Sequence, residues 1–226
     1  MLRPIVLLAL PCALLLGACG GGATTPPAPP ARTDFAQPTQ IVGKISDYNK
    51  LNGTLEILGK NKQVLSSATM KTTGDFTIDL PNATGATKLN EATFQYLAQG
   101  VQKNGEGCTG KGILSNPAAQ VYILGFLQLV QGNTKNPLAS NTLSIFKDVV
   151  IGNISIWLYA SSAVSLTGEK NCGGKLRTTN IQLKSGWNQT FLSIAADASS
   201  SWQSVDPAST SWGEPTQMVL FLSVPE

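Results

Sequence analysis

The chain has no histidine among its 226 residues, and this absence excludes several classes of active site. A Ser-His-Asp triad, a Cys-His pair and the usual catalytic zinc or copper sites all need an imidazole. Carboxylates are the remaining side chains that could act as acid and base. We therefore expect no metal site and no cofactor, and we expect that the protein is not an enzyme.

Charged side chains are also scarce. They make up 13% of the residues, and the formal net charge is +3. This bias is too weak to indicate a nucleic-acid partner or an electrostatic membrane surface. Long amphipathic helices would carry more Glu, Lys and Arg, whereas 22 glycines and many uncharged polar residues favour an all-β protein.

The first 19 residues have the parts of an export signal: Arg3, an apolar run from Ile5 to Leu16, and small residues before Cys19. The run is shorter than the about 20 apolar residues of a membrane-spanning helix, and Pro11 interrupts it. The alternatives are plain secretion, with a free thiol at Cys19, and a retained anchor.

The residues Leu16-Gly17-Ala18-Cys19 resemble the lipobox of bacterial lipoproteins. In that family the chain is cut before the cysteine, which then carries acyl chains such as palmitate. The resemblance implies a signal peptide over residues 1–18, lipid attachment at Cys19, and an extracytoplasmic location in the cell envelope with the membrane as a partner. The family's sorting rule implies an outer membrane where one exists, because no Asp follows Cys19. Two or more acyl chains give stable anchoring.

Residues 19–38 are predicted to be a tether. The run Pro26-Pro27-Ala28-Pro29-Pro30 lies at their centre, and such a composition favours extended chain and cannot bury a core.

The two cysteines that remain after Cys12 leaves with the signal and Cys19 takes lipid are Cys108 and Cys172. In an oxidising compartment they are predicted to form one disulfide. It would close a loop of about 65 residues, worth roughly 4 kcal/mol in the chain-entropy model.

From residue 39 the pattern changes to short alternating segments separated by turns. Asn52-Gly53 favours a hairpin, and Thr73-Gly74-Asp75 marks a second turn. The segments Ile41–Ile45, Gly53–Ile57 and Thr73–Pro81 resemble a carboxypeptidase-regulatory or transthyretin-like β-sandwich module. This resemblance covers residues 39–82 and implies a fold, with a structural or binding role and no catalysis.

Residues 83–226 continue as a β-sandwich or form a second β domain, and the sequence leaves both open. Val121–Val130 is predicted to be one buried central strand, and Ile154, Ile156 and Leu158 are predicted to face the core. Further strands follow at the spacing of an antiparallel sandwich, with Trp157 and Trp187 as core residues.

The segment from Asp197 to Gly213 is rich in serine and is predicted to be an exposed loop. Trp202 and Trp212 lie in it and are the candidate binding surface, since exposed indoles stack on sugars or on protein partners. The alternative is that one or both pack into the core. Asp197, Asp206 and Glu214 could pair across a cleft in a hydrolase, although acids in loops are mostly solvated.

Together these patterns predict a lipid-anchored protein of the cell envelope with a structural or protein-interaction role. The alternative is a module at the membrane surface that binds a glycan, such as cell-wall polysaccharide, or a small ligand. A carboxylate-dependent hydrolase is the third possibility.

Overall fold

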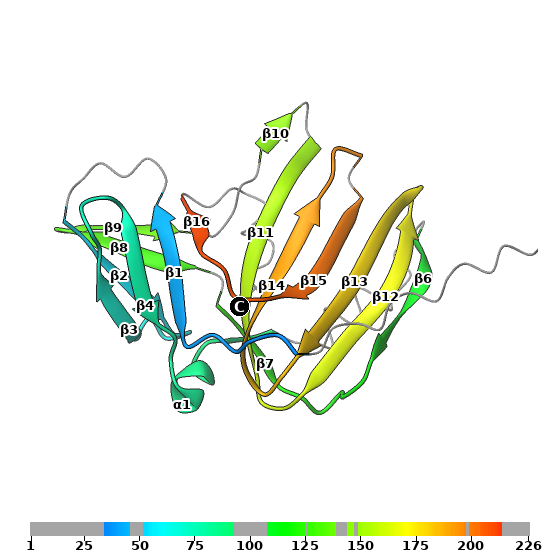
Figure 1. Cartoon of the computed structure of the whole chain (residues 1–226), viewed down its shortest axis with the longest axis horizontal. Helices are drawn as coiled ribbons and strands as arrows, with labels where there is room; N and C mark the ends of the chain where they lie inside the picture. Colours follow the sequence, from blue (N-terminus) through cyan, green and yellow to red (C-terminus); the bar gives the residue numbers. More distant parts are fainter. Residues whose placement is uncertain are drawn as a thin grey trace, which may run out of the picture. The chain divides into compact units, whose positions relative to one another are not determined.

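The computed structural model describes residues 34–45, 52–92, 108–124, 126–138, 144–146, 149–197 and 199–213. All of them belong to the compact unit that spans residues 32–226 (Figure 1). The predicted signal, most of the predicted tether and residues 214–226 lie outside the described residues.

The described chain is almost entirely β-structure in three sheets, which confirms the predicted all-β class. A three-stranded sheet has the order β16 (Thr210–Trp212), β1 (Gln40–Ile45), β4 (Asp75–Asp79). A four-stranded sheet has the order β3 (Val64–Thr69), β2 (Thr54–Leu58), β8 (Leu127–Gln131), β9 (Thr134–Leu138).

The largest sheet has the order β5 (Asn90–Ala92), β7 (Val121–Leu124), β11 (Val149–Ala160), β14 (Gly186–Ile194), β15 (Ser200–Val205), β13 (Lys175–Leu183), β12 (Val164–Cys172), β6 (Cys108–Leu114). A ninth strand, β10 (Ser144–Phe146), pairs with β11. Most pairs are antiparallel, as predicted, but β1 with β16 and β13 with β15 are parallel. Among the described residues α1 (Ala83–Ala86) is the sole α-helix. The described part of the chain contains no helix that is long and apolar enough to cross a membrane.

Local sequence explains the first strands. β1 and β4 alternate exposed and buried residues, as a strand with one face on the core requires, and Ile41 and Ile78 are completely buried. The predicted turn before β4 is present, where Gly74 has φ of 84° and donates its amide to the Lys71 carbonyl at 2.9 Å. Gly43 has to be glycine, since a Cβ there would lie 2.6 Å from Phe76 Cζ.

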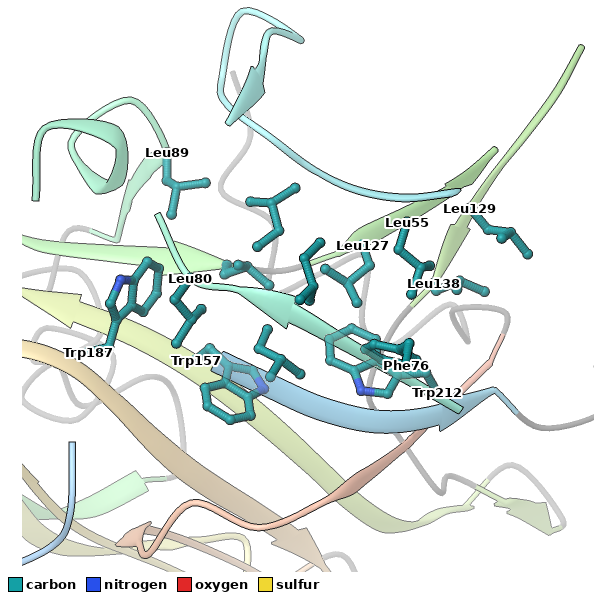
Figure 2. Packing of buried hydrophobic residues seen from close by; sticks show 14 of the residues in the cluster. Leu55, Phe76, Leu80, Leu89, Leu127, Leu129, Leu138, Trp157, Trp187 and Trp212 are labelled. Atoms are coloured by element: carbon teal, nitrogen blue, oxygen red, sulfur yellow. The ribbon is translucent and has the colours of Figure 1, made fainter. Parts of the chain in front are cut away.

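A mixed aromatic and aliphatic core joins the three sheets (Figure 2). Trp157 and Trp187 belong to it, as predicted, and the Trp187 indole N–H donates to the Pro81 carbonyl at 2.7 Å. Its members come from strands distant in sequence, for example Ile41, Leu55 and Trp157.

A second, largely aliphatic core lies on the other face of the largest sheet. Ile154, Ile156 and Leu158 are buried in it, which confirms the predicted core face of this segment. Its buried members all come from this one sheet, with Val121 at one side and Leu166 at the other, so the sheet curls around its own aliphatic face.

Two predictions about strands and turns were wrong. Val121–Val130 forms two strands, β7 in the largest sheet and β8 in the four-stranded sheet, because the chain changes sheets between Leu124 and Leu127. Asn52-Gly53 is not a hairpin turn between β1 and β2, since β1 pairs with β4 and β16 while β2 pairs with β3 and β8.

The prediction that the segment from Asp197 to Gly213 is an exposed loop was also wrong. Its centre forms β15, which lies between β14 and β13, and its end forms β16 beside β1. The serine-rich sequence has little apolar alternation and so did not indicate these strands, whose position depends on pairing with their neighbours.

The end of the predicted tether contacts the folded unit. Lys184 Nζ donates to the Phe35 carbonyl at 2.7 Å, and the Gln37 side-chain amide donates to the Ser185 carbonyl. The Ala36 amide donates to Asp206 Oδ1 at 3.3 Å. The chain is therefore bound along the largest sheet before β1 begins.

Candidate functional site

One face of β11 changes character along the strand. Trp157 lies in the mixed core, with Tyr159 packed against it. The next two side chains of the same face, Ser155 and Asn153, are half-buried and line an open groove. The face that is core at one end of the strand is thus a polar surface at the other.

The groove has a volume of about 520 Å³. Strands β11, β14 and β15 form its floor, and the chain from Asp206 to Ser211 forms one side. Nearly all of the lining side chains are small or uncharged and polar: Asn153, Ser155, Gln189, Phe191, Gln203, Val205, Asp206, Ala208, Ser209, Thr210 and Ser211.

Strand register sets the middle of the floor. Ser155 pairs with Phe191, and Phe191 pairs with Gln203 on the next strand. A half-buried aromatic ring therefore lies between a hydroxyl and a carboxamide. Such a row offers an apolar face with hydrogen-bonding groups on both sides.

The side of the groove is held by Gln189, which is 3% exposed. Its carbonyl oxygen accepts from the Ala208 amide at 2.8 Å, and its amide nitrogen donates to Ser155 Oγ at 3.3 Å. Asp206 accepts from the Ala36 amide, as described above. Ser155 and Gln189 are thus hydrogen-bonded to each other, and Gln189 and Asp206 each accept from a backbone amide.

A second hollow of about 190 Å³ lies farther along the same strands. No charged residue is among the described residues that line it: Leu176, Thr178, Ser193, Ala195, Ser199, Ser200 and Ser201. The turn beside it is fixed by Asp197, whose Oδ1 accepts from Ser199 Oγ at 2.6 Å and from the Ser199 amide at 2.8 Å. These hydrogen bonds lower the pKa of the Asp197 carboxyl, and nearby Lys175 lowers it further.

The two tryptophans of the predicted binding surface are structural. Trp212 is 1% exposed and packs edge-on against Phe76, with ring centroids 6.1 Å apart. Trp202 is half-buried against the aliphatic core, and its indole N–H donates to Thr190 Oγ1 at 2.9 Å. The prediction of an exposed pair was therefore wrong, and the alternative, that they pack inward, is correct.

Of the three acids that could pair across a cleft, Asp197 and Asp206 do not meet, and Glu214 lies outside the described residues. Asp197 precedes β15 and Asp206 follows it, so the six residues of that strand, about 20 Å at the usual rise, separate them. Glycosidase carboxyl pairs lie roughly 5–10 Å apart. Within the described residues no group of three or more acids or cysteines could hold a metal ion.

Two short sequence patterns that occur in enzymes stand in the wrong context here. Gly105–Gly110 has the spacing Gly-x-Gly-x-x-Gly, but its described part opens strand β6 rather than a helix. Ser144–Lys147 has the spacing Ser-x-x-Lys, and its described residues form strand β10. Neither pattern indicates an active site.

Comparison of the chain with protein-family models, with characterised proteins and with solved structures finds no match. The site is therefore interpreted from its own geometry. A signal for it exists in β11, because Asn153 and Ser155 are polar residues at alternate positions of an otherwise apolar strand. Strand β14 gives no such signal, since Asn188, Gln189 and Thr190 are consecutive polar residues.

Proposed function

We propose that this protein is a lipid-anchored, extracytoplasmic binding module of the cell envelope, without catalytic activity, whose ligand lies in the groove over β11, β14 and β15. The observation that carries the proposal is the lining itself. Uncharged hydrogen-bonding side chains surround Phe191, and ligand sites typically combine an apolar contact with a few placed polar groups. A hydroxyl-rich ligand such as a glycan matches this chemistry best.

The groove is tested by Phe191→Ala. The wild-type protein is titrated with neutral oligosaccharides, for example those of chitin, cellulose and xylan, by calorimetry. We expect the alanine variant to lose about tenfold or more in affinity, by analogy with nucleic-acid bases, for which stacking on an aromatic side chain contributes roughly 1–3 kcal/mol.

Ile113→Ala is the matched control, because Ile113 is an exposed apolar residue on β6, far from the groove in strand order. It should bind as the wild type does. Unchanged affinity in Phe191→Ala, or no binding to any of these glycans, would reject the groove as a glycan site.

The anchor rests on the lipobox resemblance at Leu16-Gly17-Ala18-Cys19. Cys19→Ser should abolish metabolic labelling by an alkyne analogue of palmitate and release the protein from the membrane fraction. A Cys12→Ser variant is the control, since that residue precedes the cleavage point. Full membrane association of Cys19→Ser with unchanged labelling would contradict the anchor.

A structural or protein-interaction role is the second candidate, and strand β6 favours it. It ends the largest sheet among the described strands and carries Ile113 with 69% of its surface exposed. Sheet edges can accept a strand from a partner. Ile113→Lys should then reduce recovery of a cross-linked envelope complex, whereas Val64→Lys, an exposed valine on a different sheet, should not.

We also propose the disulfide between Cys108 and Cys172. Support comes from the register of β6 and β12, in which Cys172 lies directly opposite Cys108. Directly opposed strand residues have Cα atoms about 4.5–5.5 Å apart, within the range that disulfides span.

A further inference from the structure

We infer that the groove and the second hollow are two parts of one continuous track along β14 and β15, and that the track binds a linear, uncharged glycan chain rather than a small molecule. This inference rests on the proposed function and specifies the ligand of the same site.

Strand periodicity places both hollows on one face of the sheet. On β14, Gln189 and Phe191 line the groove, and Ser193 and Ala195 line the second hollow. These residues alternate along one strand, so their side chains point to the same side. The residues between them belong to the opposite face, where Thr190 is completely buried and Leu192 packs on the aliphatic core.

Strand β15 repeats the arrangement beside β14. Val205 and Gln203 line the groove, and Ser201 lines the second hollow. Register pairs Gln203 with Phe191 and Ser201 with Ser193, so the row that lines the groove and the row that lines the second hollow follow one another directly on this face. From Gln189 to Ala195 the track is about 20 Å long at the usual rise of a strand.

The charge and the hydrogen-bonding groups of the side chains along the track determine which class of ligand can bind. Among the described residues that line the two hollows, Asp206 is the single charged one, and its carboxylate accepts from the Ala36 amide. The remaining polar groups are hydroxyls and carboxamides, which both donate and accept hydrogen bonds and therefore match sugar hydroxyls. An anionic polymer would find no cationic partner among the described residues that line the two hollows.

Phe191 lies within this track and is flanked by Ser155 and Gln203. One face of a pyranose ring is largely C–H, so it can pack on the phenyl ring while its hydroxyls reach the flanking side chains. Successive sugars would then continue over Ser193 and Ser201 into the second hollow.

The test compares ligand lengths on the full-length protein. Neutral disaccharides and hexasaccharides of chitin, cellulose and xylan are titrated by calorimetry, with hexagalacturonate as a charged chain and a neutral hexapeptide as a chain of another class. We expect at least one neutral hexasaccharide to bind about tenfold more tightly than its disaccharide, and we expect both of the other chains to bind more weakly.

The decisive variant is Ser201→Tyr, which fills the second hollow and leaves the groove open. It should reduce the affinity for the hexasaccharide about tenfold, to the level of the disaccharide, with disaccharide binding unchanged. Ser67→Tyr is the matched control, because Ser67 is an exposed serine on strand β3 of another sheet. It should change neither affinity.

The outcomes separate the inference from the function on which it rests. Equal affinity for short and long chains, or a Ser201→Tyr variant that binds the hexasaccharide normally, would overturn the continuous track, while sensitivity to Phe191→Ala would preserve the groove. Tighter binding of hexagalacturonate or of the peptide would overturn the uncharged glycan as the ligand. Absence of binding to every glycan would overturn both.

Discussion

Trp212 illustrates at the residue scale how one side chain can join distant parts of the chain. Its indole lies against Phe76 of β4, and its N–H donates to Thr210 Oγ1 at 2.7 Å. Because it is 1% exposed, Trp212→Ala should remove about 3–5 kcal/mol from the free energy of unfolding, as for other buried aromatic residues. Urea denaturation followed by circular dichroism measures this.

Trp202→Ala provides the comparison for that prediction. The Trp202 ring is half-buried and donates one hydrogen bond to Thr190. We therefore expect a smaller loss of about 1–3 kcal/mol in the free energy of unfolding. If Trp212→Ala were as stable as the wild type but no longer bound its ligand, Trp212 would have to be an exposed contact after all.

Asp197 gives a prediction about pH. Its pKa is lowered mainly by the hydrogen bond from the Ser199 hydroxyl. A carboxyl whose folded-state pKa is depressed stabilises the folded state fully above its unfolded pKa of about 4, and this contribution is lost as the pH falls through the folded value. The Ser199 amide should therefore stay protected from hydrogen exchange until the pH falls below about 4.

In an Asp197→Asn variant the acid-dependent part of the protection of the Ser199 amide should disappear, because the asparagine side chain does not titrate at about pH 4. The side chain of asparagine still accepts a hydrogen bond, so the turn itself should remain. An acid transition at Ser199 that persisted unchanged in Asp197→Asn would assign it to another group.

At the scale of elements, sequence pattern predicted strands well where one face is aliphatic and failed where polar strands lie within the sheet. Ile154, Ile156 and Leu158 were placed correctly because alternation alone identifies such a face. The strand Ser200–Val205 was missed, since its serines carry no periodic apolar signal and its position depends on β13 and β14. The break within Val121–Val130 was missed for a related reason, because both halves are equally apolar.

The pair β6 and β12 supplies the prediction at this scale. With a disulfide from Cys172 to Cys108, the variant Cys172→Ser should lose roughly 4 kcal/mol of stability, or less if strain in the bond offsets part of the entropy. The double variant Cys108→Ser with Cys172→Ser should behave as the single variant does. Mass spectrometry of the non-reduced, alkylated protein measures the bond directly, and two free thiols there would disprove it.

For the whole molecule, the sequence predicted the chemical class of the surface better than its location. Composition indicated many uncharged polar residues, and the groove has this character, but Trp212 is buried and Trp202 half-buried instead of forming an exposed pair. The groove depends on the pairing of β14 with both β11 and β15, strands that are separated by up to about 50 residues along the chain, and no local pattern encodes that pairing. Trp202 and Trp212 were predicted to bind a ligand because large aromatic rings stack on ligands, but large aromatic rings also stabilise a core when they are buried.

The last prediction concerns how the whole site responds to solution conditions. The chain has no histidine, and one carboxylate is found among the described residues that line the two hollows. The affinity for a neutral hexasaccharide should therefore be nearly constant between about pH 5 and about pH 8. The affinity should also change less than about twofold when the salt concentration rises from about 0.1 M to about 1 M, because salt screens charge pairs and not neutral hydrogen bonds. Calorimetric titrations across both series measure this, with binding of Phe191→Ala as the baseline. A steep loss of affinity with salt would show that fixed charges contribute to recognition, and the ligand would then have to carry the opposite charge.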